Sequence, residues 1–208
     1  GETYRQMGEH ARALVEFDRA IELDPQYAEA IASRGETYRQ MGEYDKALAD
    51  FDRAIEIDPK YARAIANRGQ TYQQMGQYDK ALADFDRAIE IDPKYAWAIA
   101  NRGQTYRQMG EYARALAEFD RVIELDPSLN WAIALRGETY RQMGEHARAL
   151  AEFDRAVELD PSLNWAIALR GETYRQMGEH ARALAEFDRA VELDPSLNWA
   201  IALRGETY

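Results

Sequence analysis

The stretch Arg34–Gly42 reads RGETYRQMG, and close copies of it recur along the whole chain at a fixed interval. The copies begin at Arg68, Arg102, Arg136 and Arg170, each 34 residues after the last. A fixed period of this length is typical of solenoids built from one supersecondary unit. The chain divides into a partial repeat 1–27, full repeats 28–61, 62–95, 96–129, 130–163 and 164–197, and a partial repeat 198–208. We therefore expect one continuous solenoid over residues 1–208.

Repeat 62–95 illustrates the predicted unit. Residues 62–75 carry apolar side chains at helical rather than strand spacing. Gly76 is predicted to end this first helix, as glycine commonly does. A second helix follows from Tyr78, and Asp92 and Pro93 end it because proline cannot continue a helix. All thirteen glycines occupy two positions of the repeat and all six prolines occupy one, so every repeat is predicted to be a helical hairpin.

The repeat resembles the tetratricopeptide repeat, and the resemblance covers the whole chain. It implies an all-α fold: an α-solenoid of stacked antiparallel helical hairpins, wound as a right-handed superhelix whose concave face is lined by the first helices. Two departures are Ile65, where the family often has Trp, and the recurring arginine from Arg34 to Arg204, where it usually has Leu. The arginine variant resembles a bacterial subset. The matching residues of repeat 62–95 are Ile65, Gly69, Tyr72, Ala81, Phe85, Ala88 and Pro93.

Charge and composition narrow the classes of partner. The formal net charge of −11 argues against a nucleic acid or an anionic membrane as principal partner, because both would repel the chain. With no cysteine, disulfides, thiolate metal sites and a cysteine nucleophile are excluded. The sequence has no signal-like segment and no apolar run long enough to span a bilayer. We expect a cytoplasmic, soluble fragment of a longer protein.

Catalysis and metal binding are not expected. Nearly every polar residue is copied at the repeat interval, so no unique catalytic constellation is present, and we predict no catalytic residue and no cofactor. His10, His146 and His180 share one position of the repeat. Equivalent residues of stacked hairpins should lie roughly 10 Å apart, too far for two ligands of one zinc ion.

Ligand contacts in peptide-binding members of the family come mainly from the first helices, and the resemblance carries this role onto particular residues. Asn67 and Asn101 match the asparagines that hold an extended peptide backbone, since an amide both donates and accepts. The chaperone-adaptor pattern is not met, because alanine replaces its lysine. The other candidates are Gln70, Gln104, Arg107, Arg141 and Arg175.

Tryptophan provides a second kind of candidate contact. Trp97, Trp131, Trp165 and Trp199 would form a stripe with one indole per hairpin, and tryptophan is enriched at binding hot spots. Alternatively, each indole packs on neighbours such as Leu129 and Leu163.

Charged residues of the second helix have two interpretations. Lys46, Asp50, Asp52, Arg53 and Glu56 lie at spacings that allow pairs within one helix, which favours a solvated outer face. Alternatively, the recurring arginine pairs across hairpins, for example Arg68 with Asp52, and acts as a strut between repeats.

The sequence thus predicts a scaffold that binds a protein or peptide in its groove. The alternative is a structural array that self-associates head to tail, because residues 198–208 resemble the start of the first helix that the given sequence lacks before Gly1. This contact requires that one copy of GETY, which is present at both Gly1–Tyr4 and Gly205–Tyr208, frays or shifts. By resemblance to bacterial arrays, a third hypothesis is the non-catalytic sensing part of a larger signalling enzyme.

Overall fold

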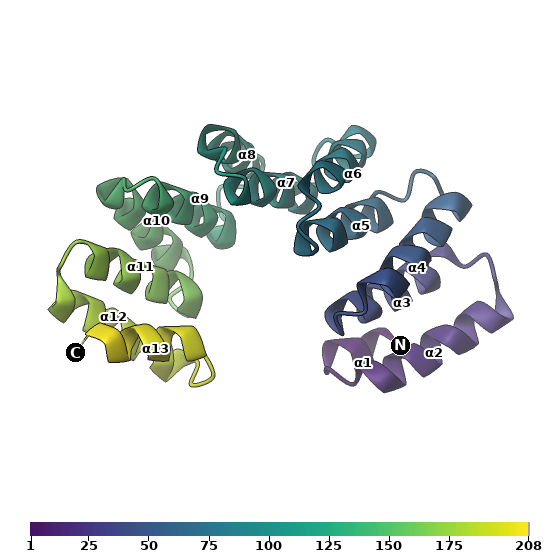
Figure 1. The fold of residues 1–208 in the computed structure, drawn as a ribbon, viewed down its shortest axis with the longest axis horizontal. Helices are drawn as coiled ribbons and strands as arrows, with labels where there is room; N and C mark the ends of the chain where they lie inside the picture. The colour runs from purple at the N-terminus through teal and green to yellow at the C-terminus, as the bar shows by residue number, and fades with distance from the viewer. Residues whose placement is uncertain (208) are drawn as a thin grey trace. The chain divides into compact units, whose positions relative to one another are not determined.

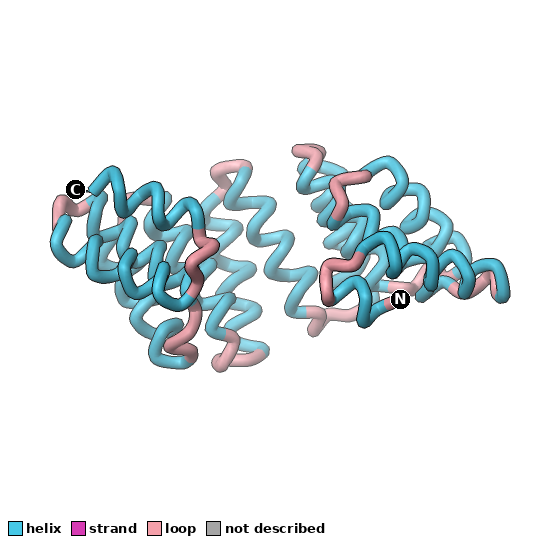
Figure 2. The backbone as a smooth tube through the Cα atoms, turned by 90° about the horizontal axis from the view of Figure 1, so that it is seen from below, coloured by secondary structure: helices cyan, strands magenta, loops and turns pink. Residues whose placement is uncertain are grey.

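A computed structural model describes residues 1–207, and every regular element in that range is an α-helix, as Figure 2 shows. The predicted all-α fold is confirmed. The helices are α1 (Glu2–Gln6), α2 (His10–Leu23), α3 (Ala28–Gln40), α4 (Tyr44–Ile57), α5 (Ala62–Gln74), α6 (Tyr78–Ile91), α7 (Ala96–Gln108), α8 (Tyr112–Leu125), α9 (Asn130–Gln142), α10 (His146–Leu159), α11 (Asn164–Gln176), α12 (His180–Leu193) and α13 (Asn198–Thr207).

Helix ends fall where glycine and proline predicted them. α5 ends at Gln74, and Gly76 follows with φ of +73°, a left-handed conformation that glycine adopts without steric cost. The N–H of Gln77 donates to the carbonyl of Tyr72 at 2.8 Å, which closes the end of α5. α6 ends at Ile91, because Asp92 is extended and Pro93 follows it.

The helices divide into two compact units, Gly1–Thr105 and the residues from Tyr106 onward. Figure 1 labels the hairpins of each unit. The first unit contains the pairs α1–α2, α3–α4 and α5–α6, and the second contains α9–α10 and α11–α12, with α8 packed on α9 and α13 on α12. The boundary lies within α7. One continuous right-handed superhelix over the whole chain stays a prediction.

Within a hairpin, one glycine allows the two helices to cross closely. A Cβ added at Gly69 on α5 would lie 3.1 Å from Cε1 of Phe85 and 3.2 Å from the carbonyl oxygen of Ala81, both on α6. Phe85 and Ala81 are fully buried. Each such phenylalanine contributes about 1.5–3 kcal/mol by burial. The fully buried equivalents of Phe85 are Phe51, Phe119, Phe153 and Phe187.

The recurring arginine does join neighbouring hairpins. Arg68 of α5 donates from Nη1 to Oδ1 of Asp52 on α4 at 2.6 Å, so the predicted strut is confirmed. Arg68 also donates from Nε and Nη2 to Asp84 of α6, at 2.8 and 2.6 Å. These hydrogen bonds raise the pKa of Arg68 further above its ordinary value. The equivalents of the Arg68–Asp52 pair are Arg34–Asp18, Arg102–Asp86, Arg136–Asp120, Arg170–Asp154 and Arg204–Asp188.

The expectation of a wholly solvated outer face is therefore wrong for part of the second helix. Asp50 is only 6% exposed, because Arg34 donates to both of its carboxylate oxygens. Arg53 donates to the backbone carbonyl of Pro25 at 2.6 Å, in the loop of the preceding hairpin. The two contacts join residues of different elements, 16 and 28 residues apart, which helical spacing alone does not reveal.

Candidate functional site

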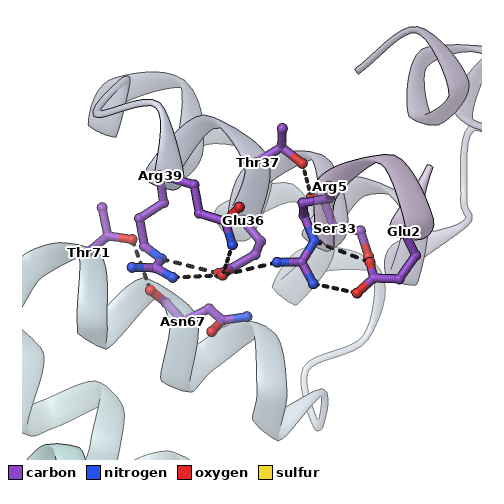
Figure 3. A network of polar contacts seen from close by, with 9 residues as sticks. Glu2, Arg5, Ser33, Glu36, Thr37, Arg39, Asn67 and Thr71 are labelled. Atoms are coloured by element: carbon purple, nitrogen blue, oxygen red, sulfur yellow. Dashed lines mark hydrogen bonds and ion pairs between the residues drawn. The ribbon is translucent and has the colours of Figure 1, made fainter. Parts of the chain in front are cut away.

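In the first unit, the first helices are joined by a cluster of charged side chains that sequence reasoning missed. Glu36 of α3 is buried and accepts hydrogen bonds from Arg39 at 2.6 and 3.1 Å and from Gln40 at 3.0 Å. Arg5 of α1 reaches the same carboxylate at 3.5 Å and also pairs with Glu2. Figure 3 shows Glu2, Arg5, Glu36 and Arg39 pointing toward one another. A glutamate three residues before an arginine on a helix was the available signal.

The predicted asparagines lie on the neighbouring first helices and are largely covered. Asn67 is 7% exposed and Asn101 is 4% exposed. The amide nitrogen of Asn101 donates to the carbonyl of Trp97 at 2.8 Å, so this donor is already used within α7. Figure 3 places Asn67 beside Thr71 on the element next to α3. A peptide at this face would therefore meet only the edges of these amides.

On α5, Gln70 and Gln73 occupy the positions that Glu36 and Arg39 hold on α3. Gln73 of α5 donates to the hydroxyl of Thr105 on α7 at 3.0 Å. Gln70 keeps a buried Oε1 for which residues 1–207 supply no donor, and Gln104 is half-buried. Trp97 is half-buried and stacks on Tyr95, with ring centroids 5.9 Å apart. These contacts commit part of the predicted groove to packing between helices.

A hollow of about 320 Å³ opens in the first unit beside α1 and α3. Its lining includes Tyr27, Ser33 and Arg63, with three carboxylates from Glu2, Glu16 and Glu29. Because Glu2 is already paired with Arg5, the charged side chains left in the lining are Glu16, Glu29 and Arg63.

The second unit presents a more apolar first-helix face. Trp131 on α9 and Trp165 on α11 are half-buried, and Trp199 on α13 is 40% exposed. One turn after the first two indoles lie Leu135 and Leu169, also half-buried. These leucines occupy the position that Asn67 and Asn101 hold in the first unit. We call the five residues Trp131, Leu135, Trp165, Leu169 and Trp199 the Trp–Leu stripe.

The three predicted arginines belong to ion pairs beside the Trp–Leu stripe. Arg141 donates to Glu138 at 2.7 and 2.8 Å, and Arg107 of α7 reaches the same carboxylate at 3.2 Å. Arg175 donates to Glu172 at 2.6 and 2.9 Å. Burial lowers the pKa of Arg107. Burial is also the largest influence on Arg141 and lowers its pKa, but the hydrogen bonds to Glu138 together with the charges of Glu138 and Glu172 raise the pKa overall. A ligand would find these charges already neutralised.

The described residues form no cluster suited to a metal ion. Among residues 1–207, no three histidine, aspartate or glutamate side chains gather in a way that could hold a metal ion. Nδ1 of His10 and of His146 is buried without a partner in the same range. None of the helices in this range is long and apolar enough to cross a membrane.

Comparison with known families agrees with this architecture. A family model described as TPR repeat matches residues 1–38 and 35–76. Two models described as tetratricopeptide repeat match residues 62–95 and 96–129, and residues 134–198. The chain belongs to the tetratricopeptide repeat family. Proteins of this family are generally interaction scaffolds, and no curated protein sequence is significantly similar to this one.

Solved tetratricopeptide repeat structures share the fold. One from Parabacteroides merdae is 24% identical with a TM-score of 0.84, over 98% of this chain and 80% of that one. PilW, a type IV pilus biogenesis factor, is 21% identical with a TM-score of 0.84, over 97% and 94%. YrrB, described as having an unusual peptide-binding site, is 24% identical with a TM-score of 0.60, over 91% and 97%. At these identities the likeness concerns the fold alone.

Proposed function

We propose that this tetratricopeptide repeat chain is a non-catalytic interaction scaffold that binds an extended peptide or a partner helix on its first-helix faces. The observation that carries the proposal is the Trp–Leu stripe, where Trp199 remains 40% exposed and the adjoining arginines are paired internally. Large aromatic groups on a surface that needs no counter-charge are what a peptide-binding face requires.

The two units supply different binding chemistry. The face of the first unit presents the edges of the amides of Asn67 and Asn101. The face of the second unit offers indoles and leucines. A partner that uses both faces would therefore combine a polar segment with an apolar one, whereas a short peptide would bind only one.

The test is a peptide-library selection followed by affinity measurements on two sets of variants. Trp131→Ala with Trp165→Ala removes the aromatic contacts of the second unit, and Asn67→Ala with Asn101→Ala removes the amides of the first. We expect the double variant on the bound face to weaken binding by about 1–3 kcal/mol or more, from typical hydrogen-bond and hot-spot values.

Matched controls lie on the exposed second helices. Glu56→Gln and Glu158→Gln change one exposed side chain in each unit and should leave affinity unchanged. Selected peptides whose affinity responds to neither pair of first-helix substitutions would place binding elsewhere and contradict the proposal. Circular dichroism of each variant verifies that the helices are retained.

Head-to-tail association of copies stays a prediction. It predicts an average mass in light scattering that rises with protein concentration. A mass that stays at one chain up to millimolar concentration would contradict it.

A further inference from the structure

Resting on the proposed function, we propose that the Trp–Leu stripe binds a proline-rich segment in the polyproline II conformation, with an apolar residue at every third position. This assigns a ligand class to the second unit alone. The argument uses the spacing of the indoles, the width of the stripe and its charge.

The spacing of the indoles matches the pitch of polyproline II. α11 packs directly against both α9 and α13, and each of the three helices carries one tryptophan at the same position. Packed helices lie about 8–10 Å apart, so one indole recurs at about that interval. Polyproline II has three residues per turn and rises about 3.1 Å per residue, which returns a side chain to the same face every ~9 Å.

A β-strand does not fit this interval. Its side chains return to one face at every second residue, about 6.6–6.8 Å apart, and its third residue points to the opposite face. Successive indoles would then meet side chains out of register. An extended ligand that contacts each hairpin in the same way must therefore repeat in threes.

The width of the stripe excludes the other periodic ligand, an α-helix crossing the hairpins. Trp131 and Leu135 are separated by four residues on α9, so the apolar stripe extends about 6 Å along the helix axis. One turn further, the Glu138–Arg141 pair bounds it with charge. A helix with its side chains is about 10–12 Å across, wider than the stripe. A single extended chain needs only about 4.8 Å, the spacing of neighbouring strands.

Charge and hydrogen bonding favour the same ligand. Glu138 and Glu172 are each paired with an arginine of their own helix, so this face needs no charged group on its ligand. The backbone carbonyls of polyproline II have no internal partners, and each indole supplies one N–H donor. Aromatic-lined grooves bind such segments in other proteins because the conformation is already formed in the free peptide.

The experiment compares three synthetic peptides by tryptophan fluorescence and calorimetry on the full chain. The first repeats the triplet Pro-Pro-Leu. The second has the same length and composition, with its leucines moved out of the threefold register. The third is an amphipathic helix with leucine at heptad spacing. We expect the Pro-Pro-Leu peptide to bind about tenfold or more tightly than the others, given the area that a buried leucine removes from water.

The matched variant gives the second unit the asparagines of the first. Leu135→Asn with Leu169→Asn places in the second unit the residue that the first unit has at Asn67 and Asn101, a substitution that the repeat already tolerates. This double substitution should weaken the affinity for the Pro-Pro-Leu peptide by about tenfold or more. Glu158→Gln, which changes an exposed side chain on α10, is the control and should leave affinity unchanged.

Each outcome decides the proposal. Failure of the Pro-Pro-Leu peptide to bind at millimolar concentration, equal binding of the shuffled peptide, or indifference to the leucine exchange would overturn it. Preferential binding of the helical peptide with the same dependence on Leu135 and Leu169 would overturn the ligand class but leave the proposed function standing. The proposed function falls separately, when ligands from the library ignore the first-helix variants of both units.

Discussion

Arg68 of the first unit and its equivalent in the second, Arg136, pair with carboxylates of different length, Asp84 and Glu152. The geometry of the ion pair differs between them. In the first unit, Asp84 accepts from both Nε and Nη2 of Arg68 and is 6% exposed. In the second unit, Glu152 accepts twice from Nη2 of Arg136, at 2.8 Å each. Nε of Arg136 is then buried with no partner among residues 1–207.

The difference shows that one extra methylene shifts the carboxylate from the side of the guanidinium to its end. A side-on carboxylate forms the bidentate pair that gives arginine its strongest and most specific contact. The pKa of Arg68 is raised chiefly by hydrogen bonding to Asp84, whereas burial is the largest influence on Arg136 and opposes the rise that Glu152 causes. We therefore expect the first unit to depend on its arginines more than the second does.

The largest expected effect does not distinguish the units, because both use the same glycine crossing. Gly69→Leu and Gly171→Leu each place a side chain within 3.2 Å of the facing helix and should destabilise their hairpins by about 3 kcal/mol or more, at the upper end of overpacking costs. Hydrogen exchange should show loss of protection around the altered hairpin, since each hairpin contacts only its neighbours.

Gly205→Leu is the control for this crossing, because a Cβ there meets no atom within 4 Å. Uniform loss of protection along the chain, or an equal effect of the control, would contradict local packing as the cause.

Replacing the arginine with alanine should lower the free energy of unfolding more in the first unit than in the second. Arg68→Ala leaves Asp84 buried without its bidentate partner, and we expect a loss of about 2–3 kcal/mol, discounted from fully buried pairs because Arg68 is partly exposed. Arg170→Ala leaves Glu186, whose side chain is 18% exposed, and should cost about 1 kcal/mol. Urea unfolding followed by hydrogen exchange measures both, and equal losses would remove the proposed difference.

Exchanging aspartate and glutamate between the two units tests whether carboxylate length sets the geometry of the ion pair. Glu152→Asp should allow side-on pairing with Arg136 and stabilise its hairpin by about 0.5–1 kcal/mol, a typical hydrogen-bond value. The reciprocal Asp84→Glu should destabilise the first unit by a similar amount. Nitrogen NMR of the arginine Nε–H reports the new hydrogen bond directly. A destabilised Glu152→Asp variant would show that backbone spacing, rather than carboxylate length, sets the geometry.

The smallest effect concerns the loops between hairpins. In the second unit, the hydroxyl of Ser162 donates to Asp160 at 2.6 Å and is the main reason that the pKa of Asp160 lies below its ordinary 3.8. Ser162→Ala should raise this pKa, as measured by carbon NMR titration. The stabilisation linked to a lowered pKa is present above the ordinary value and is lost as the pH falls through the folded value. The variant should therefore be slightly less stable than the parent at every pH above the ordinary pKa of Asp160, and the difference should vanish in more acidic solution.

Lys60→Ala is the matched control in the first unit. The backbone N–H of Lys60 donates to Oδ1 of Asp58 at 3.0 Å. The substitution retains this hydrogen bond. Lys60→Ala should therefore leave the pH dependence of unfolding unchanged. A change as large as that caused by Ser162→Ala would show that the serine hydroxyl is not the cause.

The sequence by itself determined the hairpins and their ends. Gly76 and Pro93 act through local backbone preference, so each marks a helix end without knowledge of the rest of the chain. The apolar period likewise predicted the burial of Phe85 and Ala81. One tertiary contact, Arg68 with Asp52, was also accessible, because both residues recur in every repeat.

Only the tertiary structure decided which polar groups meet across helices. Glu36 joins Arg39 to Arg5, Asp84 lies beside Arg68, and the amide nitrogen of Asn101 donates to Trp97 within its own helix. Such choices depend on the rotation and distance between packed helices, to within the length of one hydrogen bond. Periodicity places a residue on a face of its helix, but it does not specify that rotation or the partner that the rotation brings near.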